Sequence, residues 1–366
     1  MCIEGCWGAG VGVEPVWARE IRKGALDGTG LIVVPGGWAR LKLAALGRGG
    51  IKALRQFVSQ GGWYLGLCGG AGLGLKGGLG LVGMERARGQ GRLPLLSGPL
   101  RVRREGGEWF WRGLGEEEVF YVWWPGQFGE LIEGVEVVAS YSGAEPGLVS
   151  GEEDVVSCRD WEEAERRAGV RLNPRVLWGT PAVITAEVGK GRAVLSYLHL
   201  DTPRDLPGAR ALRNICYEAL GSLPPAPPLP AHPSTGLGQD LVEEGRRLIE
   251  MGRKLGILRP RPGGLPVLAR GKRGLELMSL GWMMQAAGRW AGAADEQELK
   301  RLWEDLRPVV EKAQGVWERL AAEPGAAETS WFPGPRRWGG ALERALGSLE
   351  WLTGTLARRL IRAQGA

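Results

Sequence analysis

Apolar residues form short runs in the first part of the chain and follow helical spacing in the last part. Residues 30–34 (GLIVV) and 63–67 (WYLGL) have the length and content of buried strands. Between them, three-to-four spacing predicts a helix through Leu41, Leu46, Ile51, Leu54 and Val58. The order strand, glycine loop, helix, strand is typical of an open parallel α/β sheet, whose ligands bind outside the carboxyl ends of the strands.

Shorter elements precede and follow this unit. We expect a short strand at 11–17 and a helix or helical turn at 18–26. After residue 93, turns rich in Gly and Pro separate several candidate strands. Two helices are also expected there, one of them highly charged. The expected strands are 100–103, 119–124, 135–141, 182–187 and 193–197, the last two forming a hairpin, and the expected helices are 160–168 and 210–220.

A proline-rich stretch separates this part of the chain from a helical one. Residues 223–233 (LPPAPPLPAHP) hold six prolines and predict an extended linker. Beyond it, apolar residues repeat every three or four positions. We therefore expect an α/β domain at 1–222, a linker at 223–239 and a helical domain at 240–366, with a core that contains Trp282, Trp303, Trp317 and Trp351.

Composition and charge narrow the class of protein. The chain has 366 residues and 44% hydrophobic residues, enough for two cores. Residues 236–366 hold 21 Lys and Arg against 16 Asp and Glu, but at helical spacing, which favours a solvated helix face over a nucleic-acid surface. The sequence has no long uncharged apolar run and no signal-peptide pattern at its start, so we expect a cytoplasmic protein with no membrane or nucleic-acid partner.

Cysteine and histidine usage argues against disulfides and metals. The five cysteines, at 2, 6, 68, 158 and 216, are scattered and form no CxxC pair. His199 and His232 are the only histidines, too few for a His-rich metal site. We expect no cofactor and no bound metal.

Cys68 lies among glycines directly after the strand at 63–67, in the segment GGWYLGLCGGAG (61–72). Gly66, Gly69 and Gly70 stand where a side chain would block a tight strand-to-helix turn, as in the nucleophile elbow of hydrolases. A helix that begins after Cys68 would point amide groups at the sulfur and favour the thiolate. A buried structural cysteine in a glycine-rich turn is the alternative.

A cysteine nucleophile needs a base and a group that orients the base. His199 follows a predicted strand, and Asp201 lies two residues further on. Residues i and i+2 of a strand share a side, so the acid can reach the imidazole. Cys68, His199 and Asp201 thus form a candidate triad.

These segments resemble a known superfamily. VVPGGW (33–38), GGWYLGLCGGAG (61–72) and GKGRAVLSYLHLD (189–201) are similar to the class I glutamine amidotransferase-like superfamily. Within it, LIVVPGGWA (31–39) and WWPGQFG (123–129) resemble most closely the N-terminal-domain family of biotin-protein ligases. The resemblance extends over roughly residues 11–220 and implies a flavodoxin-like open parallel sheet.

The resemblance also implies roles for individual residues. Cys68 would be the nucleophile, His199 the general base and then acid, and Asp201 the residue that orients His199. The backbone amides of Gly37 and Gly69 would form the oxyanion hole, and the substrate would be a small amide that passes through a thioester. Two features differ from the superfamily: Asp201 stands where glutamate is usual, and the first strand and helix of the fold are nearly absent before residue 11.

Two functions remain open at this point. The first is a cysteine-dependent amidohydrolase or amidotransferase-like protein. The second is a non-catalytic binding or regulatory module that uses the helical domain to bind a separate protein. The ordered cysteine, histidine and acid favour the first, whereas the shorter acid and the missing first strand favour the second.

Overall fold

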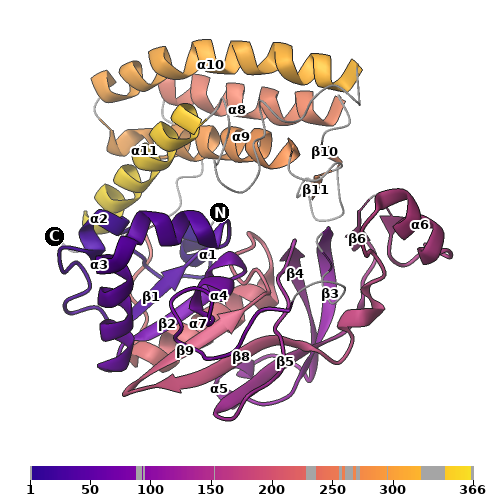
Figure 1. Cartoon of the computed structure of the whole chain (residues 1–366). Helices are drawn as coiled ribbons and strands as arrows, with labels where there is room; N and C mark the ends of the chain where they lie inside the picture. Colours follow the sequence, from indigo (N-terminus) through magenta and orange to yellow (C-terminus); the bar gives the residue numbers. More distant parts are fainter. Residues whose placement is uncertain are drawn as a thin grey trace. The chain divides into compact units, whose positions relative to one another are not determined.

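The chain separates into two compact units in a computed structural model. The structure describes residues 2–87, 93, 95–151, 153–227, 236–254, 258–259, 267–268, 273–294, 296–322 and 343–363. One unit comprises 1–12 and 16–226, and the other comprises 13–15 and 227–366 (Figure 1). Residues 228–235 of the predicted linker lie outside the described residues.

Nine strands of the described residues form one open sheet in the first unit. Along it the order is β1-β2-β9-β8-β5-β3-β6-β7, with β4 paired to β3. The strands are β1 (Leu31–Val34), β2 (Trp63–Leu67), β3 (Leu96–Arg104), β4 (Glu117–Trp123), β5 (Val135–Ala144), β6 (Val149–Ser150), β7 (Glu153–Asp154), β8 (Pro181–Val188) and β9 (Gly191–Ser196). The expected α/β architecture is present, with the predicted strands close to their expected bounds.

Fewer strands of the sheet are parallel than the predicted flavodoxin-like fold would have. Strands β1, β2 and β9 are parallel neighbours, whereas β8, β5, β3 and β4 pair antiparallel. Because β9 lies beside β2, Leu67 is opposite Ser196, and the ends of both strands open on the same edge. This pairing brings the segment after β2 close to the segment after β9.

The first residues differ from the sequence expectation. Residues 11–17 form neither a strand nor a helix in the described structure. Helix α1 (Cys2–Gly8) precedes them, and α2 (Ala18–Ile21) follows as a single helical turn. Three of the seven residues at 11–17 are valine, but strand propensity alone does not supply a neighbouring strand to pair with.

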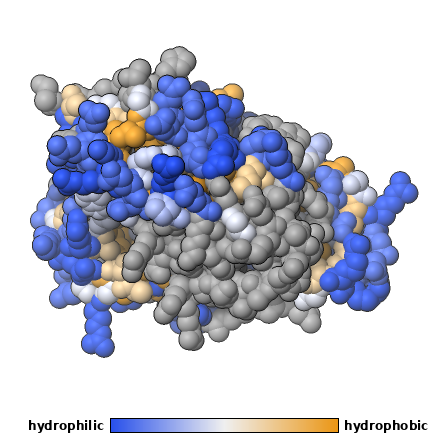
Figure 2. Space-filling model, turned by 90° about the horizontal axis from the view of Figure 1, so that it is seen from above, coloured by the Kyte–Doolittle hydropathy of each residue, from blue (hydrophilic) through white to orange (hydrophobic). Residues whose placement is uncertain are grey.

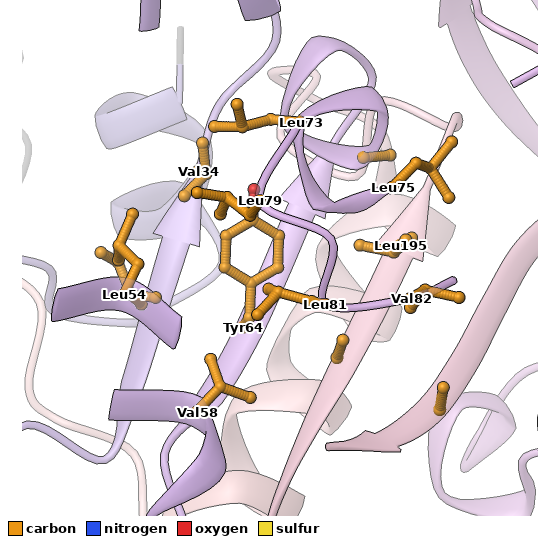
Figure 3. Packing of buried hydrophobic residues seen from close by; sticks show 14 of the residues in the cluster. Val34, Leu54, Val58, Tyr64, Leu73, Leu75, Leu79, Leu81, Val82 and Leu195 are labelled. Carbon is orange, nitrogen blue, oxygen red and sulfur yellow. The ribbon is translucent and has the colours of Figure 1, made fainter. Parts of the chain in front are cut away.

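Helices α3 (Ala39–Ser59) and α4 (Gly69–Gly74) pack on one face of the parallel strands. Figure 3 shows Tyr64 of β2 at the centre of this core, between Leu54 of α3 and Leu81 of the loop after α4. The Tyr64 hydroxyl donates a hydrogen bond of 2.7 Å to the carbonyl of Gly70. This bond ties the strand to the first turn of α4.

The first unit contains four more helical segments after α4 among its described residues. They are α5 (Glu108–Trp111), α6 (Trp161–Ala168), a 3-10 turn (Pro174–Leu177) and α7 (Leu206–Leu220). Helix α6 is the charged helix expected at 160–168, and its region is blue at the right of Figure 2. Asp160 caps it, accepting a bond from the Glu163 amide.

The second unit is helical, as expected, with one short hairpin. It contains α8 (Leu237–Lys254), β10 (Leu258–Arg259), β11 (Val267–Leu268), α9 (Arg273–Arg289), a 3-10 turn (Ala291–Ala293), α10 (Glu296–Ala322) and α11 (Glu343–Arg362). None of the helices in the described ranges is both long and apolar enough to cross a membrane.

The tryptophan core predicted for this unit is not what the structure shows. Trp282 and Trp303 are half-buried and Trp351 is exposed, while the Trp317 side chain lies outside the described residues. Trp290 is the buried tryptophan instead. Helical spacing does not separate the centre of a helix face from its edge, and a ring as large as indole can reach either.

Candidate functional site

Cys68 lies between β2 and α4 with φ 49° and ψ −102°. A positive φ is uncommon for a residue with a side chain and is found mainly where the surrounding structure enforces it. The turn is closed by the Cys68 amide, which donates to the Ser196 carbonyl of β9 at 2.7 Å. The predicted strand-to-helix turn is therefore present with Cys68 at its apex.

The glycines around Cys68 are required by backbone contacts. A Cβ on Gly70 would lie 2.0 Å from the Val34 carbonyl oxygen, and one on Gly66 would lie 2.6 Å from the Gly70 carbonyl group. Real Cβ atoms do not approach backbone so closely. The end of β1 and the turn at Cys68 pack main chain against main chain, which leaves room for glycine alone.

His199 comes next to Cys68 because β9 is the neighbour of β2. The His199 amide donates to the Tyr121 carbonyl at 2.8 Å, which fixes the backbone after β9. A Cβ on Gly36 would lie 3.3 Å from His199 Nε2 and 3.6 Å from Cys68 Cβ, so both side chains border the same glycine. The nearby Cys68 side chain is one of the groups that raise the pKa of His199.

Asp201 holds the other nitrogen of the imidazole. His199 Nδ1 lies 2.9 Å from Asp201 Oδ1. The contact does not come from the strand geometry expected from the sequence, because residues 199–202 form a turn in which the Thr202 amide donates to the His199 carbonyl at 3.0 Å. This turn, and not the alternation of side chains along a strand, brings the Asp201 carboxylate to the His199 ring.

Burial and charge act in opposite directions at this pair. Burial alone would lower the pKa of His199, but the negative charges of Asp201 and a Cys68 thiolate, with hydrogen bonds to both, raise it from 6.5 to about 10. Burial would raise the pKa of Asp201, but the charge and hydrogen bond of His199 lower it. The Asp201 carboxylate thus stabilises the protonated form of the buried imidazole.

Gly37 and Gly69, the expected oxyanion-hole residues, are in contact. A Cβ on Gly69 would lie 1.7 Å from the Gly37 carbonyl oxygen and 3.0 Å from the Gly37 nitrogen. Gly37 has φ 97°, which glycine adopts freely. The loop after β1 and the first residue of α4 therefore meet beside Cys68.

Trp123 and Trp124 cover the sulfur, a feature that was not predicted from the sequence. The Cys68 thiol donates to the Trp123 carbonyl at 3.6 Å and lies 4.0 Å from the Trp124 carbonyl. Cys68 is 8% exposed, His199 5% and Asp201 1%. The only sequence signal was the Pro125-Gly126 pair, which marks a turn directly after the predicted strand.

Trp124 has φ 47°, an unfavourable conformation for a bulky residue. We expect Trp124→Gly to be more stable than Trp124→Ala by about 1 kcal/mol, because both lose the same indole and only alanine retains the penalty of a positive φ. Chemical denaturation of the two variants measures the difference. Equal stabilities would mean that the loop relaxes to a negative φ once the ring is removed.

Asp205 is a second buried acid beside this segment. Its Oδ1 accepts a bond of 3.2 Å from the Gly208 amide and caps α7, while its Oδ2 is buried with no partner among the described residues. Burial raises the pKa of Asp205 to about 7, and the backbone donors offset only part of this effect. The carboxyl is therefore largely protonated in the folded state below neutral pH.

Asp205→Asn should stabilise the protein above about pH 7. A folded-state pKa above the unfolded value, about 3.9, means that the stabilisation by the bound proton is complete below that value and is lost as the pH rises through about 7. Asparagine keeps the cap without the charge. Urea denaturation at acidic and alkaline pH tests this, and Asp205→Ala, which loses the cap, should cost about 1 kcal/mol at both.

Comparison with known proteins finds a family match for the segment that contains Cys68. Residues 13–77 match the family described as "Biotin-protein ligase, N terminal". The match to this biotin-protein ligase N-terminal family, predicted from the sequence, includes the glycine loop after β1 and the turn at Cys68. It ends before the segment that contains His199 and Asp201.

Solved structures give weaker likenesses. A protein described as part of a GMP synthase from Thermoplasma acidophilum is 14% identical, with 54% of this chain and 74% of that chain covered and a TM-score of 0.33. A glutamine amidotransferase is 20% identical, with 60% and 92% covered and a TM-score of 0.36. A β-galactosidase from Rahnella sp. R3 is 15% identical, with 63% of this chain and only 28% of that chain covered and a TM-score of 0.37. Among curated proteins, none matches the chain.

Proposed function

We propose that the protein is a cysteine-dependent amidohydrolase or amidotransferase-like enzyme that acts on a small amide. The observation that carries the proposal is the position of the His199 ring, with Nδ1 on the Asp201 carboxylate and Nε2 beside Gly36, the glycine that the Cys68 side chain also borders. A nucleophile, a base and an orienting group in this order are the minimum that covalent acyl transfer needs. The match of residues 13–77 to the biotin-protein ligase N-terminal family supports the fold around Cys68 but not a particular substrate.

In the proposed reaction the Cys68 thiolate attacks the amide carbon and forms a C–S bond. Protonated His199 gives its proton to the nitrogen as the C–N bond breaks, so ammonia or an amine leaves and a thioester remains. Water then attacks the thioester, His199 takes its proton, and the C–S bond breaks to release the acid and restore the Cys68 thiolate beside protonated His199. The amides of Gly37 and Gly69 would stabilise the oxyanion in both steps.

The second candidate is a binding or regulatory module. The closed state of the site favours it, because the thiol is hydrogen-bonded to the Trp123 carbonyl and little of Cys68 is exposed. In this case a separate protein bound to the helical unit would be the partner. A substrate can reach the sulfur only if the segment at Trp123 and Trp124 moves.

Limiting iodoacetamide at neutral pH should distinguish the two candidates. We expect Cys68 to be labelled first, although Cys158 is more exposed, because burial and the nearby acid Glu153 raise the pKa of Cys158. Burial also raises the pKa of Cys216, to about 12. Peptide mass spectrometry gives the order of labelling, and Cys68→Ser provides the blank.

Labelling of Cys158 or Cys216 before Cys68 would contradict the catalytic proposal. The companion assay is release of ammonia from a panel of primary amides by the wild type and by Cys68→Ser. A reactive Cys68 without release of ammonia from any of them would favour the binding module.

A further inference from the structure

The outer face of α3 borders a hollow that the proposed reaction does not use. Its volume is about 610 Å³, within the range of ligand sites. The hollow is lined by Arg48, Lys52 and Arg55, which follow one another at helical spacing of four and three residues and therefore share one face. It lies near the start of β2, whereas Cys68 follows the end of that strand.

The positive charge of this hollow is not balanced. Among the described residues that line it, none is acidic. None of the ion pairs formed within the described ranges includes Arg48, Lys52 or Arg55. Like charges three or four residues apart on a helix repel each other, so the arrangement carries a cost that a bound anion would remove.

The backbone of α3 adds a second reason for an anion. Gly47 interrupts the helix with φ 59° and ψ −176°, so a new helical segment begins at Arg48. A cation at the start of a helix opposes the helix dipole, which favours negative charge at that end. The positive charge of Arg48 therefore destabilises the start of this helical segment when no anion is bound. The same charge would attract a bound anion.

Arg55 is already held in place for such a ligand. Its Nε donates to the Leu79 carbonyl, and one of its terminal nitrogens lies 3.3 Å from the Cβ position of Gly80, where a side chain would crowd it. The guanidinium of Arg55 thus lies over the loop after α4. The bond to Leu79 uses only Nε and not the two terminal nitrogens. A fixed guanidinium loses less entropy on binding a planar or tetrahedral oxyanion than a mobile one.

The rest of the lining is mixed. Gln56 and Ser59 supply polar groups, and Ile51, Leu81 and Val188 supply apolar surface. We propose that this hollow binds a phosphate monoester carried on an apolar or aromatic body. The phosphate would lie among the three cations and the body would lie on the apolar side. This site is separate from Cys68, so the ligand is an effector and not the amide substrate.

The experiment measures the binding of 1-naphthyl phosphate to the full chain by titration calorimetry at low salt. We expect saturable binding, with inorganic phosphate and 1-naphthol each at least tenfold weaker because each has only half of the recognised features. Lys52→Glu and Arg48→Glu should each weaken binding of 1-naphthyl phosphate by tenfold or more. Higher salt should weaken it as well.

Arg40→Glu is the matched control, since it makes the same charge change at an exposed position of the same helix outside the hollow. It should bind as the wild type does. Circular dichroism of each variant verifies the fold, and Lys52→Gln provides a milder change if Lys52→Glu is unstable.

Equal losses in Arg40→Glu and Lys52→Glu would overturn the proposal, because they would reveal net charge and not a site. Equal binding of 1-naphthol, or no saturable binding of 1-naphthyl phosphate, would overturn it too. The result is independent of the proposed reaction, since binding is measured without turnover and can be repeated in Cys68→Ser.

Discussion

Replacing His199 with glutamine should slow the alkylation of Cys68 by iodoacetamide by about tenfold or more at neutral pH. The positive charge of His199 stabilises the negative charge that the sulfur carries as it attacks, and glutamine removes the positive charge while keeping polar bulk. Stopped-time labelling followed by peptide mass spectrometry measures the rate. Asp205→Asn is the control. It also replaces a buried ionisable side chain with an amide, but the Asp205 carboxylate bonds the Gly208 amide and not His199.

The pH dependence of this effect has a defined sign. Because the folded-state pKa of His199 is about 10, its positive charge is present throughout the neutral range and is lost only as the pH passes that value. The ratio of the wild-type rate to the His199→Gln rate should therefore be largest at neutral pH and approach one as the pH rises past about 10. A ratio near one at neutral pH would mean that His199 does not act on the thiol.

Gly70→Ala should destabilise the protein by about 3 kcal/mol, at the upper end of what overpacking costs. The new methyl group would meet the Val34 carbonyl oxygen at 2.0 Å and the Pro35 carbonyl oxygen at 3.2 Å, and neither is a flexible side chain that can turn away. Relief requires the end of β1 to separate from the turn at Cys68. Urea denaturation measures the loss.

Gly77→Ala is the matched control in the same segment. A Cβ there meets nothing within 4 Å, and Gly77 is not among the residues with positive φ. Alanine at such a position leaves stability within about 1 kcal/mol of the wild type, since it mainly restricts the unfolded chain. A comparable loss in both variants would mean that glycine is needed there for flexibility and not for space.

The parts of the site that could be predicted from sequence are those fixed by local sterics. Glycine at 66, 69 and 70 has a single physical explanation beside a cysteine that ends a strand, and the structure shows the corresponding backbone contacts. The hairpin of β8 and β9 was likewise evident, because Gly189 lies in the turn between them and Gly191 follows it at the start of β9. Such features depend on neighbours that are close in the sequence.

Features that depend on distant partners could not be predicted. The antiparallel order of β8, β5 and β3 is set by which faces meet, and short strands do not encode their neighbours. The bounds of α9 within the predicted helical domain are not marked by sequence, because its apolar residues, at Leu275, Leu277, Met278 and Leu280, do not follow a single stripe. The positive φ of Trp124 runs against the preference of tryptophan, so it is visible only once the loop is seen against Cys68.

The insertion of β9 beside β2 has a consequence for how the protein folds. Cys68 and His199 are separated by well over a hundred residues, and they meet only when β9 pairs with β2 in parallel register. Pairings between distant segments form slowly, because the chain entropy of loop closure opposes them. During synthesis the turn at Cys68 would leave the ribosome long before its histidine does. Under the proposed function, the thiol would therefore gain its base only after β9 has paired with β2, and the nascent chain would be spared a reactive cysteine.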